Sequence, residues 1–166
     1  MKLENHIQKI AHEGLLFYDI TPLLDNPEAV DFITGEFVNF ARKFKPTAVL
    51  GIGGAGFIFA SAVANRLKIP FHSIQKKPLT QVQGSYFAEI PQSGQALTLG
   101  ENDLDKNDTV LIIDEALATG RTLRTACELV GSFKAQVAGF ATILELTHLG
   151  ARAGFSTPEI LSLVKF

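Results

Sequence analysis

The stretch Val110-Leu-Ile-Ile-Asp-Glu-Ala-Leu-Ala-Thr-Gly-Arg-Thr122 decides the fold, because it joins a buried strand to two acids and then to a turn that opens a helix. Residues 110–113 are apolar in succession, as in a parallel strand that is covered on both faces. Asp114 and Glu115 follow at its carboxyl end, the edge where open α/β sheets bind ligands. The pattern predicts an α/β fold with a polar site at this edge.

The turn Ala118-Thr119-Gly120-Arg121-Thr122 leads into a helical pattern over residues 123–133. Free main-chain N–H groups and the positive end of the helix dipole favour an anion at such a turn. The two threonine hydroxyls and the acids above them suit a phosphate and ribose hydroxyls. The alternative is that the threonines only cap the helix and the acids are a solvated strand end.

Four segments, in chain order, resemble one family of enzymes. Residues 110–122 resemble the phosphoribosyl pyrophosphate signature of type I phosphoribosyltransferases, in which Ala-Thr-Gly-x-Thr follows an apolar strand and two acids. The other three segments resemble the adenine phosphoribosyltransferases of that family. They are Gly14-Leu-Leu-Phe-Tyr-Asp-Ile-Thr-Pro-Leu-Leu24, Gly51-Ile-Gly-Gly-Ala-Gly-Phe-Ile-Phe59 and Glu145-Leu-Thr-His-Leu-Gly-Ala-Arg152.

The resemblance implies the type I phosphoribosyltransferase fold, a mainly parallel sheet flanked by helices, with a small hood from the N-terminal segment and a mobile loop. It implies that the chain makes AMP and pyrophosphate from adenine and phosphoribosyl pyrophosphate. Asp114 and Glu115 would then hold the ribose hydroxyls and stabilise positive charge at the anomeric carbon. The family usually has two aspartates here, so Glu115 is a departure.

The same resemblance assigns the phosphate-binding turns. Ala118, Thr119, Gly120, Arg121 and Thr122 would form the cradle for the 5′-phosphate. Arg121 replaces a more usual glycine, and we expect its side chain to point to solvent rather than to the phosphate.

Gly53, Gly54 and Ala55 would bind pyrophosphate through main-chain N–H groups, because Ala55 stands where the family has an arginine. Lys76 or Lys77 would compensate for that lost charge; the alternative is that both are solvated loop lysines.

Two further roles depend on segments that depart from the family pattern. Glu89, in Ser85-Tyr-Phe-Ala-Glu-Ile90, would be the general acid that shares a proton with the purine. Ile90-Pro91 replaces a Tyr-Gly pair, and an ordinary exposed glutamate is the alternative. The main chain of Leu16 and Tyr18 would contact the adenine edge, with Phe17 beside the ring. Tyr18 replaces an arginine. Contacts made through the main chain tolerate this change, because they do not depend on the side chain.

Composition narrows the function classes. The 166 residues include 15 basic and 17 acidic side chains, and the formal charge of −2 predicts neither a nucleic-acid nor a membrane partner. A hydrophobic content of 46% supports one packed domain over residues 1–166. The lone Cys127, in a helical pattern, is expected to pack rather than react. A single cysteine cannot form an internal disulfide. This and the absence of a signal-peptide pattern favour the cytoplasm.

The four histidines show no ligand spacing, so we expect no protein-held metal. Mg²⁺ would be bound mainly through the substrate, and the family resemblance suggests a homodimer. Periodicity predicts helices over residues 3–12, 27–44, 56–67 and 123–133 and strands over residues 47–52, 71–74, 110–113 and 137–144. Residues 160–164 would form an edge strand or cover the N-terminal segment, and residues 76–100 a mobile, irregular excursion.

The departures leave other functions open. A diverged relative that binds a nucleotide or phosphoribosyl pyrophosphate as a regulator, with little turnover, is one alternative. A phosphoribosyltransferase for a different base is another. An RNA-binding regulator on this fold is the least favoured, because the sequence has no basic surface segment.

Overall fold

The computed structural model of the chain describes residues 2–12, 15–84, 86–153 and 155–166, with only the main chain for residues 12 and 15–17. Strands and helices alternate along most of its length, as the sequence predicts. The strands are β1 (Gln8–His12), β2 (Leu15–Asp19), β3 (Ala48–Ile52), β4 (Phe71–Pro78), β5 (Phe87–Ile90), β6 (Gln95–Thr98), β7 (Thr109–Leu117), β8 (Gln136–Glu145) and β9 (Glu159–Lys165). The α-helices are α1 (Thr21–Leu24), α2 (Pro27–Ala41), α3 (Gly53–Leu67) and α4 (Arg121–Ser132), and 3-10 turns form at Leu3–His6, Leu79–Gln81 and Thr147–Leu149.

Within the described residues, the main sheet has seven strands in the order β5-β6-β4-β3-β7-β8-β9. β3, β4, β7, β8 and β9 are parallel. β6 pairs antiparallel with β4, and β5 pairs antiparallel with β6 at the edge of the sheet. The chain passes from β3 outward to β4, and from β7 outward to β8, so the strand order reverses between β3 and β7. Ligands bind at the carboxyl ends of the strands at such a switch point. The predicted fold class is confirmed.

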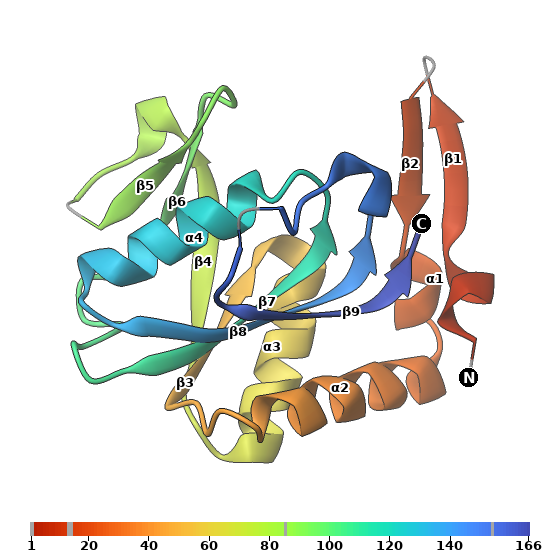
Figure 1. Cartoon of the computed structure of the whole chain (residues 1–166), viewed down its shortest axis with the longest axis horizontal. Coiled ribbons are helices and arrows are strands. Elements are labelled where there is room, and N and C mark those ends of the chain that lie inside the picture. Colours follow the sequence, from red (N-terminus) through yellow and green to blue (C-terminus); the bar gives the residue numbers. More distant parts are fainter. Residues whose placement is uncertain (1, 13–14, 85, 154) are drawn as a thin grey trace.

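Helices cover both faces of this sheet (Figure 1). α2 and α3 pack on one face, where Phe37 and Phe59 are fully buried against Leu111. α4 packs on the other face, where Leu129 is buried with Ile112. Neighbouring residues of β7 therefore enter opposite cores, as expected for a parallel strand covered on both faces.

The approach of α3 to β7 requires a glycine. A Cβ atom on Gly56 would lie 2.9 Å from the carbonyl oxygen of Ile113 and 3.3 Å from the Cα of Asp114. Such contacts are too short for any side chain, so Gly56 allows the first turn of α3 to lie against the end of β7. The first turn of α3 is thereby fixed directly beside Asp114.

The β1–β2 hairpin is a separate two-stranded sheet that stands beside the end of β9 (Figure 1). It occupies the place of the predicted hood. The predicted helix over residues 3–12 is wrong, because only Leu3–His6 forms a short 3-10 turn and Gln8–His12 pairs with β2. A helix this short is unstable alone, and the antiparallel partner provides hydrogen bonds instead.

The prediction of an irregular excursion over residues 76–100 is also wrong. β4 continues to Pro78, and β5 and β6 form a hairpin that extends the sheet. The alternation of Ala88 and Ile90 toward the core with exposed neighbours is the signal for a strand, and the turn around Gly94 joins the two. Whether this hairpin moves stays a prediction.

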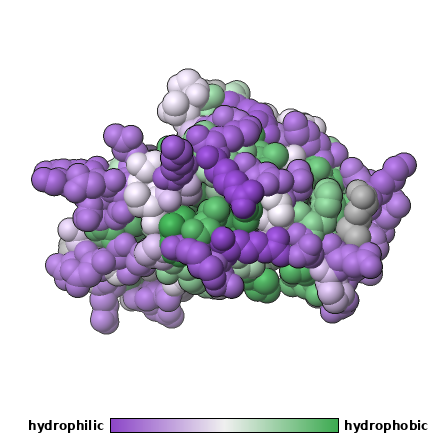
Figure 2. Space-filling model, turned by 90° about the horizontal axis from the view of Figure 1, so that it is seen from below, coloured by the Kyte–Doolittle hydropathy of each residue, from purple (hydrophilic) through white to green (hydrophobic). Residues whose placement is uncertain are grey.

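Other predicted elements agree to within a few residues, and residues 160–164 form the edge strand β9. None of the described helices has the length and apolarity needed to cross a membrane. Figure 2 views the side away from the carboxyl ends of the strands, where hydrophilic residues surround a band of apolar ones. The polar site lies on the opposite side.

Candidate active site

Asp114 and Glu115 lie in β7 just past the point where β3 stops pairing with it. The β3–β7 register ends at Gly51 and Ile113, whereas β7 continues along β8 as far as Leu117. The acids were predicted to follow the strand, but they are part of it. The loss of the β3 neighbour, not the end of β7, opens the sheet at this point.

Burial dominates the chemistry of the acid pair. Asp114 is 7% exposed, and its Oδ1 accepts a hydrogen bond from the main-chain N–H of Glu115 at 2.8 Å. Burial raises the pKa of Asp114 to about 6, although the charge of Lys76 opposes the rise. Burial, followed by the negative charge of Asp19, raises the pKa of the half-buried Glu115. Poorly hydrated carboxylates gain from each donor that a ligand brings, so the pair suits hydroxyl groups.

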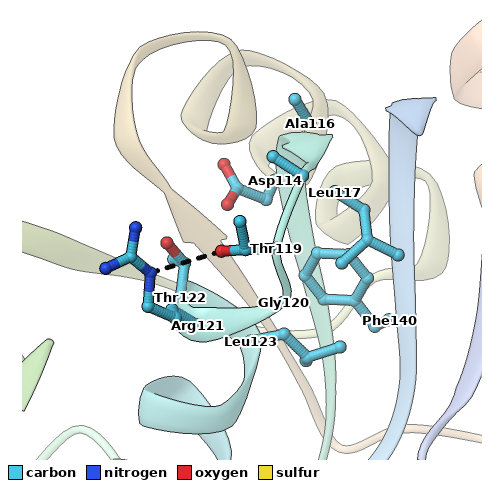
Figure 3. Close-up of a pocket in the computed structure, with 10 residues that line it drawn as sticks. Asp114, Ala116, Leu117, Thr119, Gly120, Arg121, Thr122, Leu123 and Phe140 are labelled. Atoms are coloured by element: carbon cyan, nitrogen blue, oxygen red, sulfur yellow. Dashed lines mark hydrogen bonds between the residues drawn. The ribbon is translucent and has the colours of Figure 1, made fainter. Parts of the chain in front are cut away.

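Below the acids, the β7–α4 turn forms a small pocket of about 60 Å³ that is walled on one side by Phe140. Gly120 has φ of 78° and precedes α4, whose first N–H groups receive no side-chain cap. Figure 3 shows the hydroxyls of Thr119 and Thr122 and the carboxylate of Asp114 on the same side of this turn. The alternative that the threonines merely cap the helix is therefore wrong, and the donors are free for an anion.

Arg121 is exposed, as expected, but its guanidinium makes two contacts. Its Nε donates to Oγ1 of Thr119 and its Nη1 to the carbonyl oxygen of Pro91, both at 3.3 Å. Pro91 begins the turn between β5 and β6. Arg121 thus links the β7–α4 turn to the β5–β6 hairpin.

The β3–α3 turn lies beside the β7–α4 turn, because β3 and β7 are neighbours in the sheet. Gly53, Gly54 and Ala55 form the first turn of α3, again with no side-chain cap. Ala55 is 7% exposed and belongs to the core that α2 and α3 form against the sheet. This turn offers main-chain donors and no charge.

The two candidate lysines point to opposite faces of β4, because neighbouring residues alternate in a strand. The charge of Lys76 acts on both Asp114 and Glu115. Lys77 instead lines a separate hollow together with Gln75. Only Lys76 is brought to the acid pair.

Glu89 lies on β5, exposed, opposite Ala96 of β6. Ala96 pairs on its other side with Lys77, so Glu89 and Lys77 share a face that is turned away from Lys76. In this conformation Glu89 is not on the Lys76 side of the sheet. Its role as general acid stays a prediction that requires a movement of the hairpin.

The three base-binding candidates lie on β2. Leu16 and Tyr18 are two residues apart, so their main-chain groups face the same edge of the strand. The predicted place of the Phe17 side chain lies outside the described residues. β2 ends at Asp19, whose charge acts on Glu115, so the end of this strand stands close to the acid pair.

The family profile of the phosphoribosyl transferase domain matches residues 19–153, which include the acids, both phosphate-binding turns and the β5–β6 hairpin. The chain belongs to the phosphoribosyl transferase family. This membership follows from most of the sequence rather than from the signature alone.

Several members of the phosphoribosyl transferase family resemble the chain over nearly its full length. The adenine phosphoribosyltransferase of Flavobacterium johnsoniae is 37% identical over 158 residues, with 92% of each chain covered. That of Trichodesmium erythraeum is 32% identical over 172 aligned positions that cover both chains completely. Two solved adenine phosphoribosyltransferases are 26% identical: that of Rhodothermus marinus has a TM-score of 0.88, covering 99% of this chain and 96% of its own. That of Trypanosoma brucei, in complex with AMP, pyrophosphate and ribose-5-phosphate, has a TM-score of 0.85, covering 99% and 78%.

Sequence reasoning missed the side chains that support the phosphate cradle of this family member. Arg124 donates to the carbonyl oxygen of Thr119 at 3.0 Å and stacks on Phe155, with its guanidinium 4.7 Å from the ring centre. A Cβ on Gly120 would lie 3.1 Å from the carbonyl oxygen of Ala151. The C-terminal loop thus packs on the cradle. A cation in the first turn of a helix opposes the dipole, and this was the available signal for Arg124.

A part-buried ion pair between Arg152 and the buried Glu145 holds that C-terminal loop. Both guanidinium Nε and Nη2 of Arg152 donate to the carboxylate of Glu145 at 2.8 Å, and Nη1 donates to the carbonyl oxygen of Ile160. These hydrogen bonds lower the pKa of Glu145, which is 3% exposed. The family-like segment over residues 145–152 thus forms a structural clamp next to the cradle, since Ala151 lies inside it.

The donor set for a metal is small. In the part of the chain that the structure describes, no three His, Cys, Asp or Glu side chains are grouped to hold a metal ion. Asp114 and Glu115 provide carboxylate oxygens, the ligands that Mg²⁺ prefers, but a complete shell needs oxygens from a ligand and water.

Proposed function

We propose that the chain transfers the 5-phosphoribosyl group of phosphoribosyl pyrophosphate to adenine and releases pyrophosphate, forming AMP for purine salvage. One observation carries the proposal: the buried Asp114 and the half-buried Glu115 stand directly above an uncapped helix N-terminus, at the switch point of the sheet. That arrangement matches a sugar with hydroxyls on one side and a phosphate on the other. The relatives named above as adenine phosphoribosyltransferases, and the one solved with AMP and pyrophosphate, support it.

Binding begins with the two ends of the sugar. The 5′-phosphate accepts hydrogen bonds from the N–H groups of the first turn of α4 and from the hydroxyls of Thr119 and Thr122. The ribose hydroxyls donate to Asp114 and Glu115, which restores hydrogen bonds that burial denies them. These contacts fix the anomeric carbon above β7.

The chemical step separates charge at that carbon. The bond to pyrophosphate breaks as N9 of adenine, in the tautomer protonated at N7, forms the new bond, and positive charge develops on the sugar. The N7 proton passes to the carboxylate of Glu89 after the hairpin has moved. The ionised Asp114 and Glu115 stabilise this charge, and the burial of Asp114 limits its screening by water. N–H groups of the β3–α3 turn and the ammonium of Lys76 stabilise the departing pyrophosphate.

Adenine is selected by the main chain of β2. A main-chain N–H and C=O pair from Leu16 and Tyr18 matches N1 and the 6-amino group of adenine. A 6-oxo purine presents the opposite pattern and leaves buried groups unpaired. Main-chain contacts explain how Tyr18 replaces the arginine of related enzymes.

Three accompanying features belong to the same proposal. Asp114 and Glu115 are the carboxylates that would help to hold Mg²⁺ together with oxygens of the substrate, and the ion would supply positive charge for the leaving group. The chain works as a homodimer. It acts in the cytoplasm, which suits a chain whose single cysteine, Cys127, is shielded: burial raises the pKa of its thiol to about 11.

A second candidate function is supported by the charge deficit at the β3–α3 turn. Ala55 brings no charge there, and Lys77 faces away from the acids. A protein that binds AMP or phosphoribosyl pyrophosphate as a regulator, with slow turnover, needs the phosphate cradle but little stabilisation of the leaving group.

The deciding experiment is release of pyrophosphate from phosphoribosyl pyrophosphate, with Mg²⁺ and with adenine, hypoxanthine or guanine. We expect release that depends on adenine, with hypoxanthine and guanine much slower. Release with another base alone would reassign the substrate. No release with any base, in protein that binds AMP by calorimetry, would establish the regulator instead.

Glu89 has its own test. We expect Glu89→Gln to lower the rate of AMP formation while AMP binding is unchanged, because only the proton is lost. A wild-type rate in the variant would remove Glu89 from the mechanism.

A further inference from the structure

Three side chains from the two ends of the chain form one stack beside the β1–β2 hairpin. The rings of Tyr18 and Phe166 stack with centres 4.6 Å apart and planes 22° from parallel. Nζ of Lys9 lies 4.5 Å from the centre of the Phe166 ring and 5.9 Å from that of Tyr18. Lys9 and Tyr18 are direct partners in the β1–β2 register, so both project from one face of the hairpin.

The main chain holds Phe166 in place at the end of β9. Its N–H donates to the carbonyl oxygen of Glu145 at 2.9 Å. Its carbonyl oxygen accepts from both the N–H and the hydroxyl of Thr147, each at 2.8 Å. The carboxylate of the same Glu145 binds Arg152. The Phe166 ring therefore stands on the frame that also supports the phosphate cradle.

The stack attaches the hairpin to the rest of the molecule. β1 and β2 hydrogen-bond to each other in a sheet of their own, separate from the main sheet. Ile10, which projects from the face opposite Lys9, is 45% exposed. The face of the hairpin that carries Lys9 and Tyr18 packs against Phe166. Figure 1 shows the C-terminus next to the hairpin.

We propose that Tyr18 and Phe166 are positioning residues for the purine, because their stack sets where β2 stands relative to the acid pair. The proposal rests on the proposed function, in which the main chain of Leu16 and Tyr18 contacts the base. Asp19, the next residue, already acts on Glu115, so a shift of β2 changes the distance between base and sugar. An aromatic ring at position 18 stacks on Phe166 with an overlap of two π faces, which gives a defined geometry.

The main test is Phe166→Ala, assayed with adenine and with phosphoribosyl pyrophosphate as the varied substrates. We expect the adenine KM to rise about threefold to tenfold, the range for loss of one aromatic pair. The KM for phosphoribosyl pyrophosphate should change less than about twofold, because the cradle is untouched. Phe166→Tyr keeps the ring and should restore the adenine KM. Lys9→Ala should raise it by about twofold, as expected for an exposed cation–π contact.

Phe44→Ala is the matched control. Phe44 packs edge-to-face on Phe40 at 5.1 Å, and Nζ of Lys43 lies 5.3 Å from the Phe40 ring centre, so this is a second aromatic pair with a lysine. It follows the end of α2, on the side of the molecule away from the carboxyl ends of the strands. The variant should lose stability while both KM values stay as in the wild type.

Hydrogen exchange of the amides in residues 8–12 and 15–19, without ligands, tests the stack separately from catalysis. We expect faster exchange in Phe166→Ala and wild-type exchange in Phe44→Ala. If the wild type fails to convert adenine, the proposed function fails while this measurement still reports on the stack. An unchanged adenine KM with unchanged exchange would overturn the inference, and so would an equal rise of both KM values.

Discussion

The two strand-to-helix turns at the switch point both present a free helix N-terminus, but the chemistry around it differs. Each turn leads into a helix that begins without a side-chain cap, α3 after Ile52 and α4 after Gly120. By contrast, the remote α2 is capped by Asn26, whose Oδ1 accepts from the N–H groups of Glu28 and Ala29. Of the three described α-helices with eight or more residues, the two that begin at the site, α3 and α4, are the ones with a free N-terminus.

The difference lies in what surrounds the free N–H groups. The β7–α4 turn has the buried Asp114, the half-buried Glu115 and two threonines, and Arg124 and Ala151 support it. The β3–α3 turn has only glycine and alanine. One turn therefore binds with both side chains and main chain, whereas the other depends on the main chain and on Lys76. The ribose-phosphate half of the site should be rigid and hard to alter, and the pyrophosphate half weaker.

The largest expected effect is that of Asp114→Asn, which breaks the side-chain half of the comparison. We expect the rate of AMP formation to fall by roughly a hundredfold or more, as for loss of a preorganised charge at a transition state. The hydrogen bond from the N–H of Glu115 survives in the variant, so the loss reports on charge. Steady-state kinetics at pH 7 measures it.

The same variant should be more stable than the wild type. The folded pKa of Asp114, about 6, exceeds its ordinary value of 3.8, so the folded state binds more protons and stability falls as pH rises between these values. Asparagine removes that cost, which is up to about 3 kcal/mol at pH 7 and disappears below about pH 4. Thermal unfolding at both pH values checks the sign. A variant less stable at pH 7 would contradict the burial argument.

Gly120→Ala compared with Gly54→Ala should show the next largest effect. A Cβ on Gly120 meets Ala151, Arg124 and Phe155 at 3.1 to 3.2 Å, and φ is positive, so we expect a loss of about 1–3 kcal/mol. Gly54 has no atom within 4 Å of such a Cβ. Gly54→Ala should therefore keep or slightly raise stability, because alanine favours a helix.

Binding of phosphoribosyl pyrophosphate separates the two glycines further. We expect Gly120→Ala to raise its KM by about tenfold as the cradle is distorted, and Gly54→Ala to raise it severalfold without loss of stability, because the methyl occupies the approach to the free N–H groups. Denaturant titration and KM are measured together. If Gly54→Ala binds as the wild type does, pyrophosphate does not contact the β3–α3 turn.

What the sequence could predict follows the same division. The β7–α4 turn is one contiguous segment whose apolar run, acids and small residues each have a local meaning, so strand, site and helix were all predictable. The proximity of Lys76 to the acids depends on where β4 ends, because a strand ending at Ile74 gives no alternation at positions 76 and 77. The effect of Asp19 on Glu115 and the stack of Tyr18 on Phe166 are contacts between distant segments, and no local pattern encodes them.

Lys76→Met sharpens the comparison by removing the cation whose charge acts on both acids, while keeping most of the apolar stem. The charge of Lys76 lowers the pKa of Asp114, so its loss should raise that pKa above about 6. The acidic limb of the rate profile should move to higher pH, with a loss of about twofold to tenfold at pH 7. Lys77→Met, on the opposite face, provides the control, and an equal shift of its profile would contradict the assignment of Lys76.

Arg121→Gly should have the smallest effect, although the substitution looks severe and brings in the residue more usual in the family. Both guanidinium contacts, to Thr119 and Pro91, are 3.3 Å long and exposed, and such hydrogen bonds contribute about 0.5 kcal/mol each, the low end of the usual range. We therefore expect the rate to fall no more than about threefold, because the N–H groups and the threonine hydroxyls of the cradle remain. A loss equal to that of Asp114→Asn would mean that the cradle depends on an exposed charge, and the buried acids would no longer explain the strength of this half of the site.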